Sequence, residues 1–273
     1  MRSLLRPGTV VAVLALAACS PTPPATPSVA PAVPTTVAGP TSAAPGSPSP
    51  STTVSAAASA RVVVLDPGHN GGNAGAPAVI NRQVPDGRGG TKACNTTGTS
   101  TDAGYAEHAF TFDVAQRVEQ RLSARGVRVV LTRTDDRGVG PCVDERGRAG
   151  DQAGADAVVS IHADGAAPSG TGFHVAYSDP PLNAAQRGPA RTLATDLRDS
   201  LSAAGFPRST YIGRDGLSPR TDLAGLNLAT RPTALVECAN MRSAAEAAVV
   251  TSAAGRDRYA AAIADGILRY LGP

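Results

Sequence analysis

Several patterns that would point directly to a function are absent from this 273-residue chain. The formal net charge is only +3, and neither sign of charge is gathered into a block or stripe, so nucleic-acid binding is not indicated. No Cys-x-x-Cys pair occurs, which argues against a zinc knuckle built from cysteines. No His-Glu-x-x-His motif occurs, so no single helix carries two metal ligands in that arrangement.

The N-terminal residues have the features of an export signal. Arg2 and Arg6 precede an apolar run from Val10 to Ala18, which is shorter than the roughly 20 residues that span a bilayer. The run leads into Cys19, and small residues before a cysteine at this point resemble a bacterial lipobox. We therefore expect residues 1–18 to be a lipoprotein-type signal peptide and Cys19 to be lipidated. The protein would then be exported and anchored to the outer face of the cell membrane, facing the cell wall. The alternative is an ordinary signal peptide with an incidental cysteine.

Composition divides the rest of the chain into a linker and one domain. Residues 19–60 consist largely of Pro, Ser, Thr and Ala, and such a segment cannot bury enough apolar surface to offset the entropy of ordering. We expect a disordered linker that holds the domain off the membrane. Residues 61–273 are enough for a single domain with a sizeable core, and they show no internal repeat.

The remaining three cysteines are expected to differ in role. An exported protein lies in an oxidising compartment, and Cys94 and Cys142 both fall in Gly-, Pro- and Asn-rich loops, so we expect them to form a disulfide. The alternative is that they are unpaired. Cys238 follows an apolar run and is expected to be a buried free thiol.

Hydrophobic patterns predict alternating strands and helices. Short apolar, β-branched runs indicate strands at 61–65, 127–131, 156–161, 172–177 and 233–236. Helical spacing indicates helices at 106–125, 144–153, 184–203 and 256–271. Residues 70–104 are expected to be a long functional loop. We predict an α/β fold: a single domain with a mostly parallel, twisted sheet flanked by helices on both faces.

Residues capable of metal binding and acid–base chemistry fall at the ends of the predicted strands. His69 follows the first strand, His162 ends the third and Glu237 ends the fifth, and ligands of open parallel sheets bind at that edge. Glu107 opens the helix after the first loop. Two histidines and a carboxylate are a common ligand set for catalytic zinc, with water in the fourth position. We therefore predict that His69, Glu107 and His162 hold one zinc ion and that Glu237 is the general base. Each residue also has a simpler interpretation, such as a structural histidine or a carboxylate paired with an arginine.

The motifs carrying these residues resemble the zinc-dependent N-acetylmuramoyl-L-alanine amidases of the Amidase_3 type, in the order in which the family has them. They are Val-Val-Leu-Asp-Pro-Gly-His at 63–69, Glu107 with its helix, Gly-Val-Arg-Val-Val-Leu-Thr-Arg at 126–133, Ser-Ile-His-Ala-Asp at 160–164 and Pro-Thr-Ala-Leu-Val-Glu at 232–237. The resemblance implies the same zinc ligands and the same catalytic Glu237. It also implies hydrolysis of the amide bond between N-acetylmuramic acid and L-alanine of the stem peptide, in peptidoglycan or its muropeptide fragments. Two alternatives are a non-catalytic cell-wall-binding lipoprotein with this fold and a zinc peptidase acting on stem peptides.

The chain departs from the family pattern near the site. Asp164 stands where the family more often has Asn, and the residues after Glu237 are Cys-Ala-Asn-Met rather than a Gly-Phe pair. Asp164, Asn240 and Arg133 are candidate substrate contacts, although Arg133, like Arg146, could instead brace loops through ion pairs.

The loop after His69 is longer than the family core needs, and with its disulfide it resembles a clamped flap of actinobacterial members. Some relatives insert a blocking helix near residues 178–184, where this chain has no room for one. We expect an open groove that needs no activator, and a monomer that binds no nucleic acid.

Overall fold

The computed structural model describes residues 60–273. The predicted signal peptide, the lipidated Cys19 and nearly all of the predicted linker lie outside the described residues, so these predictions stay predictions. None of the helices in residues 60–273 is long and apolar enough to cross a bilayer.

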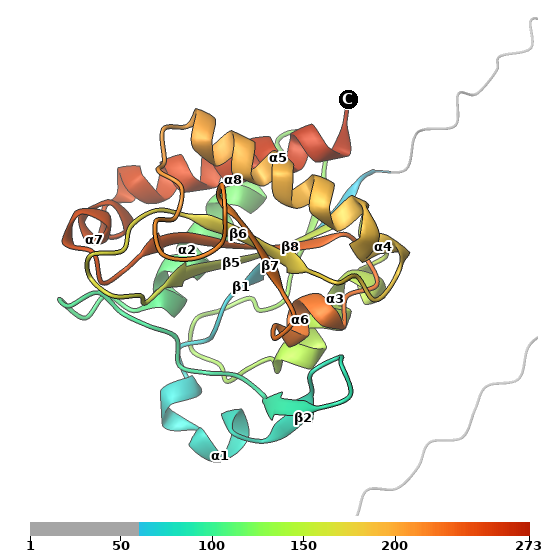
Figure 1. Cartoon of the computed structure of the whole chain (residues 1–273), viewed down its shortest axis with the longest axis horizontal. Helices are drawn as coiled ribbons and strands as arrows, with labels where there is room; N and C mark the ends of the chain where they lie inside the picture. Colours follow the sequence, from blue (N-terminus) through green and yellow to red (C-terminus); the bar gives the residue numbers. More distant parts are fainter. Residues whose placement is uncertain (1–59) are drawn as a thin grey trace, which may run out of the picture. The chain divides into compact units, whose positions relative to one another are not determined.

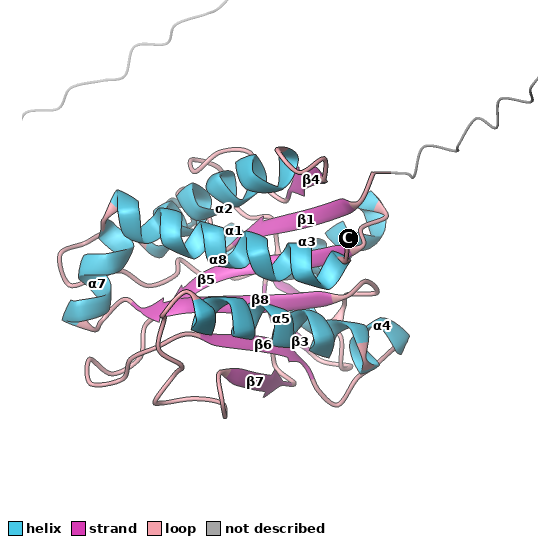
Figure 2. Cartoon of the chain, turned by 90° about the horizontal axis from the view of Figure 1, so that it is seen from above, coloured by secondary structure: helices cyan, strands magenta, loops and turns pink. Residues whose placement is uncertain are grey.

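A six-stranded sheet forms the middle layer of the domain (Figures 1 and 2). In spatial order its strands are β4 (Arg128–Leu131), β1 (Val62–Pro67), β5 (Ala157–Asp164), β8 (Thr233–Asn240), β6 (His174–Ser178) and β7 (Leu217–Arg220). Every neighbouring pair is parallel except β6 and β8, which run antiparallel. The predicted single α/β domain with a mostly parallel sheet is therefore confirmed.

Helices cover both faces of this sheet. On one face lie α2 (Glu107–Ser123), α5 (Pro189–Ala203) and α8 (Ala253–Leu271), and on the other lie α3 (Val143–Ala153) and the short α6 (Ala224–Asn227). The remaining helices are η1 (Asn73–Gly75), α1 (Pro77–Ile80), α4 (Ala184–Arg187) and α7 (Ala244–Thr251). The spacing of Phe110, Val114, Val118 and Leu122 places them on one side of α2, where all four are fully buried.

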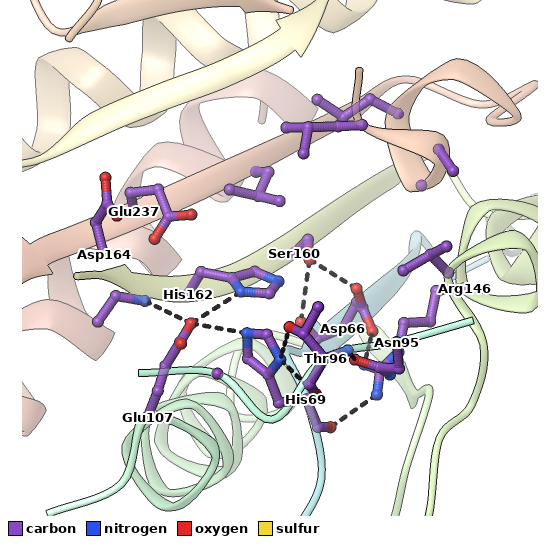
Figure 3. A pocket seen from close by; sticks show the side chains of 18 of the residues that line it. Asp66, His69, Asn95, Thr96, Glu107, Arg146, Ser160, His162, Asp164 and Glu237 are labelled. Carbon is purple, nitrogen blue, oxygen red and sulfur yellow. Dashed lines mark hydrogen bonds and ion pairs between the residues drawn. The ribbon is translucent and has the colours of Figure 1, made fainter. Parts of the chain in front are cut away.

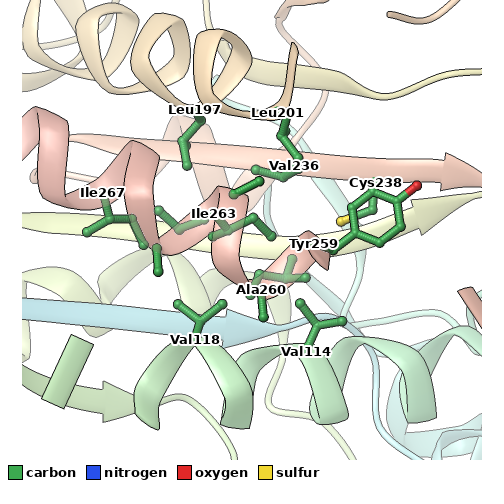
Figure 4. Packing of buried hydrophobic residues seen from close by; sticks show 14 of the residues in the cluster. Val114, Val118, Leu197, Leu201, Val236, Cys238, Tyr259, Ala260, Ile263 and Ile267 are labelled. Carbon is green, nitrogen blue, oxygen red and sulfur yellow. The ribbon is translucent and has the colours of Figure 1, made fainter. Parts of the chain in front are cut away.

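The main hydrophobic core lies between the sheet and α2, α5 and α8 (Figure 4). In it α8 packs between α2 and α5, and Tyr259 stacks on Phe206 with ring centroids 3.9 Å apart. The core residues of β5 and β8 include Val159, Ile161 and Val236, which alternate along their strands with residues that face the opposite side. Burial of this core fixes the register, because a shift by one residue would exchange the two faces.

The opposite face of the same strands carries the polar residues. Asp66 of β1, Ser160 and His162 of β5, and Glu237 of β8 alternate with the core positions of their strands, so they lie together on the face that carries α3 and α6. Apolar packing of one face thus determines which side chains are presented on the other.

Several predicted elements differ in detail from the structure. The predicted helix over 184–203 is divided into α4 and α5, because Pro189 lacks a backbone N–H and starts a new helix. Strand β7 was not predicted, since Leu217–Arg220 includes a proline and is an edge strand. Residues 70–104 are not one irregular loop: they contain η1, α1 and a hairpin of β2 (Gln83–Pro85) and β3 (Thr91–Ala93).

The structure contains the predicted disulfide between Cys94 and Cys142. It joins the end of the β2–β3 hairpin to the residue before α3, across 48 positions of sequence. Cys238 is a free, buried thiol, as expected. The disulfide is largely buried and packs with Val84 and Val143, so it belongs to a small second core beneath the hairpin.

Candidate metal centre and active site

A cavity of about 380 Å³ lies along the face of the sheet that carries α3 and α6 (Figure 3). Its lining includes His69, Glu107, His162, Asp164 and Glu237. The turn after β1, the start of α2 and the two central strands β5 and β8 each contribute to this set. The cavity therefore brings together all the residues that we predicted as zinc ligands or base.

His69 stands on a tight turn directly after β1. Its φ is 57°, in the left-handed region, and Gly68 before it has room for no side chain, because a Cβ there would lie 2.2 Å from Cε1 of His162. The backbone carbonyl of Thr96 lies 3.1 Å from Nδ1 of His69. A proton on Nδ1 donated to that carbonyl leaves Nε2 free to accept a metal ion.

Glu107 is the first residue of α2 and is the centre of the cluster. One oxygen, Oε1, lies 3.1 Å from Nε2 of His69 and 3.0 Å from Nδ1 of His162. The backbone N–H of Ala163 also donates to Oε1, and the N–H of Thr99 donates to Oε2 at 2.9 Å. The helix N-terminus and these donors together hold a carboxylate anion in a buried position.

The charges of the cluster are set by mutual contacts. Burial opposes the charged form of Glu107, but hydrogen bonds from His162 and His69 outweigh burial and hold the pKa of Glu107 well below its usual range. Burial likewise opposes protonation of His69, yet the hydrogen bond and charge of Glu107 raise the pKa of His69. The same negative charge that attracts protons to this cluster would attract a metal cation.

The donor set fits a zinc ion. The ligand atoms of His69, Glu107 and His162 all lie within 4.8 Å of one another. Donors about 2.1 Å from a tetrahedral zinc ion are roughly 3.4 Å apart, and the two contacts of Glu107 at 3.0 and 3.1 Å are within a few tenths of that value. Two nitrogens and one carboxylate oxygen form the open, three-ligand type of site that catalytic zinc uses.

Glu237 faces this cluster from the neighbouring strand. The parallel register of β5 and β8 pairs Glu237 with His162. The carboxylate oxygen Oε2 of Glu237 is enclosed and has no hydrogen-bond partner among residues 60–273. Burial raises the pKa of Glu237 well above its usual value, and the negative charges of Glu107 and Asp164 raise it further, while Arg220 acts in the opposite direction.

Comparison with known proteins gives a consistent result. Residues 63–269 match the Amidase_3 family model, described as N-acetylmuramoyl-L-alanine amidase. An N-acetylmuramoyl-L-alanine amidase of Mycobacterium tuberculosis is 52% identical over 210 residues, which are 77% of this chain and 86% of that protein. The crystal structure of the amidase Ami1 from Mycobacterium smegmatis is 54% identical, with a TM-score of 0.76 over 78% of this chain and 97% of that one. Apo Ami1 from Mycobacterium abscessus is also 54% identical, with a TM-score of 0.75 over 78% and 99% of the two chains.

The chain belongs to the N-acetylmuramoyl-L-alanine amidase family.

In this amidase the predicted substrate contacts differ in accessibility. Asp164 lines the cavity beside His162 and accepts a hydrogen bond from the N–H of Gly165. Asn240 is fully buried, and its side-chain amide donates to the carbonyls of Ala167 and Gly170. Of these two residues, only Asp164 is placed to meet a ligand in the cavity.

Arg133 is also buried, and its guanidinium donates to the carbonyls of Pro67, Gly68 and His108. It forms an ion pair with Asp136 as well. This placement favours the alternative that Arg133 braces the loops around the site.

Arg146 braces the turn that carries His69. Its guanidinium pairs with Asp66 at 2.5 Å and donates to the carbonyls of Pro67 and His69 at 2.8 and 2.7 Å. Asp66 also accepts hydrogen bonds from Thr132 and Ser160, each at 2.6 Å. Sequence reasoning missed Asp66 and Ser160, although Ser160 lies two residues before His162 on β5 and therefore on the same face of the sheet.

The other two histidines are outside the metal cluster. His108 follows Glu107 on α2 and contacts the carboxylate of Asp136. Adjacent residues of a helix point about 100° apart, so the side chain of His108 is directed away from the metal cluster that Glu107 faces. His174 is 1% exposed, packs edge-on against Tyr211, and burial lowers its pKa to about 4. Between Ser178 and Ala184 the chain contains no helix, so the amidase has no inserted helix at this position.

Proposed function

We propose that this amidase hydrolyses the amide bond between the lactyl group of N-acetylmuramic acid and L-alanine, using one zinc ion held by His69, Glu107 and His162. Glu237 is proposed to act as the general base and then as the general acid. The observation that carries the proposal is the convergence of three ligand atoms within 4.8 Å, with Glu237 opposite His162 on the adjacent strand.

When bound, a zinc ion polarises the amide carbonyl and lowers the pKa of water toward 7. The protein's own residues supply the rest. Glu107 places a negative charge at the centre of the cluster, and Thr96 and Ala163 orient His69 and Glu107 through their backbone groups.

Glu237 has the environment that proton transfer requires. Its raised pKa makes the Glu237 carboxylate a stronger base, so it can accept a proton from water and afterwards give it to the leaving amine nitrogen. Its unpartnered Oε2 has no competing donor to displace, so the side chain can face the reacting atoms.

The substrate is proposed to be peptidoglycan or its muropeptide fragments, and the protein to be an exported monomer. The lipid anchor at Cys19 and the linker rest on the sequence alone. Loss of the protein from the membrane fraction in a Cys19→Ser variant is the measurement that checks the anchor.

The experiment for the proposed reaction uses the zinc-loaded protein with insoluble peptidoglycan and with soluble muramyl peptides. Mass spectrometry of the products should show free stem peptide with an intact N-terminal L-alanine. Glu237→Gln should bind zinc normally and lose at least about a hundredfold in turnover, the lower range for removing a general base. Glu119→Gln is the matched control, because it makes the same chemical change at a residue that does not line the cavity.

Other products would favour the alternatives. Shortened stem peptides still attached to muramic acid would indicate a zinc peptidase. Binding of peptidoglycan without any product, from a protein that holds zinc, would indicate a non-catalytic wall-binding protein and would refute the proposal.

A further inference from the structure

The cavity extends well beyond the metal cluster. Along β5 its lining runs from Val158 to Asp164, which is roughly 20 Å of strand. An extended peptide of about six residues covers that length. The metal ligands and Glu237 occupy one part of it, so the remainder is available to a part of the substrate away from the bond that is cut.

The part away from the metal is mostly apolar. It is lined by Val143, Val158, Leu223, Leu226 and Leu235, and no Phe or Tyr side chain lines the cavity. A sugar ring presents many hydroxyl groups, each of which loses free energy when it is buried without a partner. A peptide presents methyl and methylene groups with fewer polar atoms, so this wall suits the stem peptide better than the glycan.

Two positively charged side chains line the cavity, and one of them, Arg146, is already paired with Asp66. Lys92, on strand β3 of the hairpin, lines the cavity and is the only lysine in the chain. Its ammonium donates one hydrogen bond, to the backbone carbonyl of Asp222 at 2.7 Å, and forms no ion pair with any residue in 60–273. An ammonium has three donors, so two stay available to a ligand.

The nearest acidic residues already have other partners. Asp86 and Asp222 are close enough for the charge of Lys92 to lower their pKa values slightly, after the effects of their own hydrogen bonds. Asp86 accepts from the backbone N–H groups of Arg88 and Gly90, and Asp222 forms a bidentate pair with Arg220.

Lys92 is connected to strand β8, near Glu237, through a short path of contacts. Leu223, next to its partner Asp222, packs with Leu235, which is two residues before Glu237 on β8. Two residues of strand are roughly 7 Å. The path of contacts from Glu237 to Lys92 is longer than these two residues, so a carboxylate that reaches Lys92 belongs to a stem-peptide residue beyond the L-alanine of the cut amide.

We propose that Lys92 binds a carboxylate of the stem peptide, so that this amidase prefers stem peptides with a free carboxylate over those in which it is a carboxamide. The inference rests on the proposed amidase function and adds to it a residue that determines specificity. The stem peptide of the substrate enters the apolar part of the cavity. The ammonium of Lys92 then donates a charge-assisted hydrogen bond to a carboxylate of that peptide.

The competing explanation is that Lys92 has only a structural role and stabilises the packing of the β2–β3 hairpin against the loop before α6 through its hydrogen bond to Asp222. Arg88 provides the matched control, because it stabilises the packing of the same hairpin and does not line the cavity. Its guanidinium donates to Asn227, Ser178 and the carbonyl of Pro180. Figure 1 shows the hairpin on the side of the sheet that carries α6.

The test measures kcat/KM of the full-length, zinc-loaded protein on four synthetic substrates. They are N-acetylmuramoyl-L-alanyl-D-glutamate, its two mono-amides and its bis-amide, so each carboxylate is removed in turn. The wild type should prefer the two substrates that keep one particular carboxylate, the free diacid and one mono-amide, by about tenfold or more in kcat/KM, the scale of one charge-assisted hydrogen bond. Lys92→Met should lose this preference through a higher KM on those two substrates alone, and Lys92→Arg should keep the preference.

The outcomes distinguish carboxylate recognition by Lys92, a purely structural role of Lys92 and failure of the proposed amidase function. Arg88→Met should change all four rates by the same factor and leave the preference intact. If the wild type cuts all four substrates equally, or if Lys92→Met slows all four alike, Lys92 does not recognise a carboxylate although the amidase function stands. If the wild type releases no L-alanyl peptide from any of them or from peptidoglycan, the proposed function itself fails.

Discussion

Replacing Asp66 by asparagine should destabilise the protein, although Asp66 is not a proposed ligand or base. Asp66 is 5% exposed, and its carboxylate pairs with Arg146 and accepts hydrogen bonds from Thr132 and Ser160. Asparagine keeps the shape and one acceptor but removes the charge. Arg146 would then be a buried cation with only backbone carbonyls around it.

The pKa of Asp66 gives the magnitude. Burial would raise this pKa, but Arg146 and the two hydroxyl groups outweigh it and lower the pKa from 3.8 to about 2. At 1.36 kcal/mol per pH unit this corresponds to roughly 2.4 kcal/mol of stability. Removing one member of a buried ion pair typically costs about 3–5 kcal/mol. We expect a loss of roughly 2–4 kcal/mol, which lowers Tm by roughly 5–15 °C for a domain of this size.

The contribution of Asp66 should depend on pH in one direction. A carboxylate whose pKa is lowered by folding stabilises the protein at pH values above about 4, and this stabilisation is lost as the pH falls through about 2. Denaturant unfolding of the wild type and Asp66→Asn, both with a chelator so that metal loss does not contribute, measures the difference from pH 7 to pH 3. The difference should be constant down to about pH 4 and shrink below it.

The control is Asp151→Asn, which removes the same charge from an exposed pair with Arg231 at 3.7 Å. Exposed pairs contribute at most about 1 kcal/mol. If Asp66→Asn were no more destabilising than this control at pH 7, the assignment of Asp66 as the anchor of Arg146 and of the His69 turn would be wrong.

Two further predictions concern the turn beside the metal cluster and the histidine outside it. Gly68→Ala places a Cβ 2.2 Å from the ring of His162, so it should reduce zinc content and turnover by about tenfold or more. Gly75→Ala, where nothing lies within 4 Å of the new Cβ, should reduce neither, and equal zinc content in the two variants would contradict the reasoning. Burial lowers the pKa of His174 from 6.5 to about 4, so the unfolded chain binds a proton in this interval that the folded protein does not. Stability should therefore fall by up to roughly 3 kcal/mol as the pH drops from about 6.5 to 4. His174→Gln should make the free energy of unfolding depend less on pH between about 6.5 and 4. If this pH dependence were unchanged in the variant, His174 would not be its cause.

Local sequence patterns were sufficient for most of the fold. Strand β1, helix α2 and strand β5 were predicted close to their observed bounds, because apolar runs and helical spacing are local signals. Strand β7 and the β2–β3 hairpin were missed. Both are short and are defined by their pairing partners rather than by their own residues.

The candidate site divides in the same way. The sequence alone determined which side chains could bind a metal ion, because His69, His162 and Glu237 each follow or end an apolar strand and Glu107 starts a helix. It also determined the family, through motifs of contiguous residues.

Only the tertiary structure decided which residues support those side chains and which line the rest of the cavity. Asp66 and Arg146 are 80 residues apart in the sequence, and Lys92 and Asp222 are 130 residues apart. Their contacts exist because strand order and loop packing bring distant segments together, and those depend on how one face of the sheet is buried. A residue's type is encoded locally, but its neighbours are set by the packing of the whole chain.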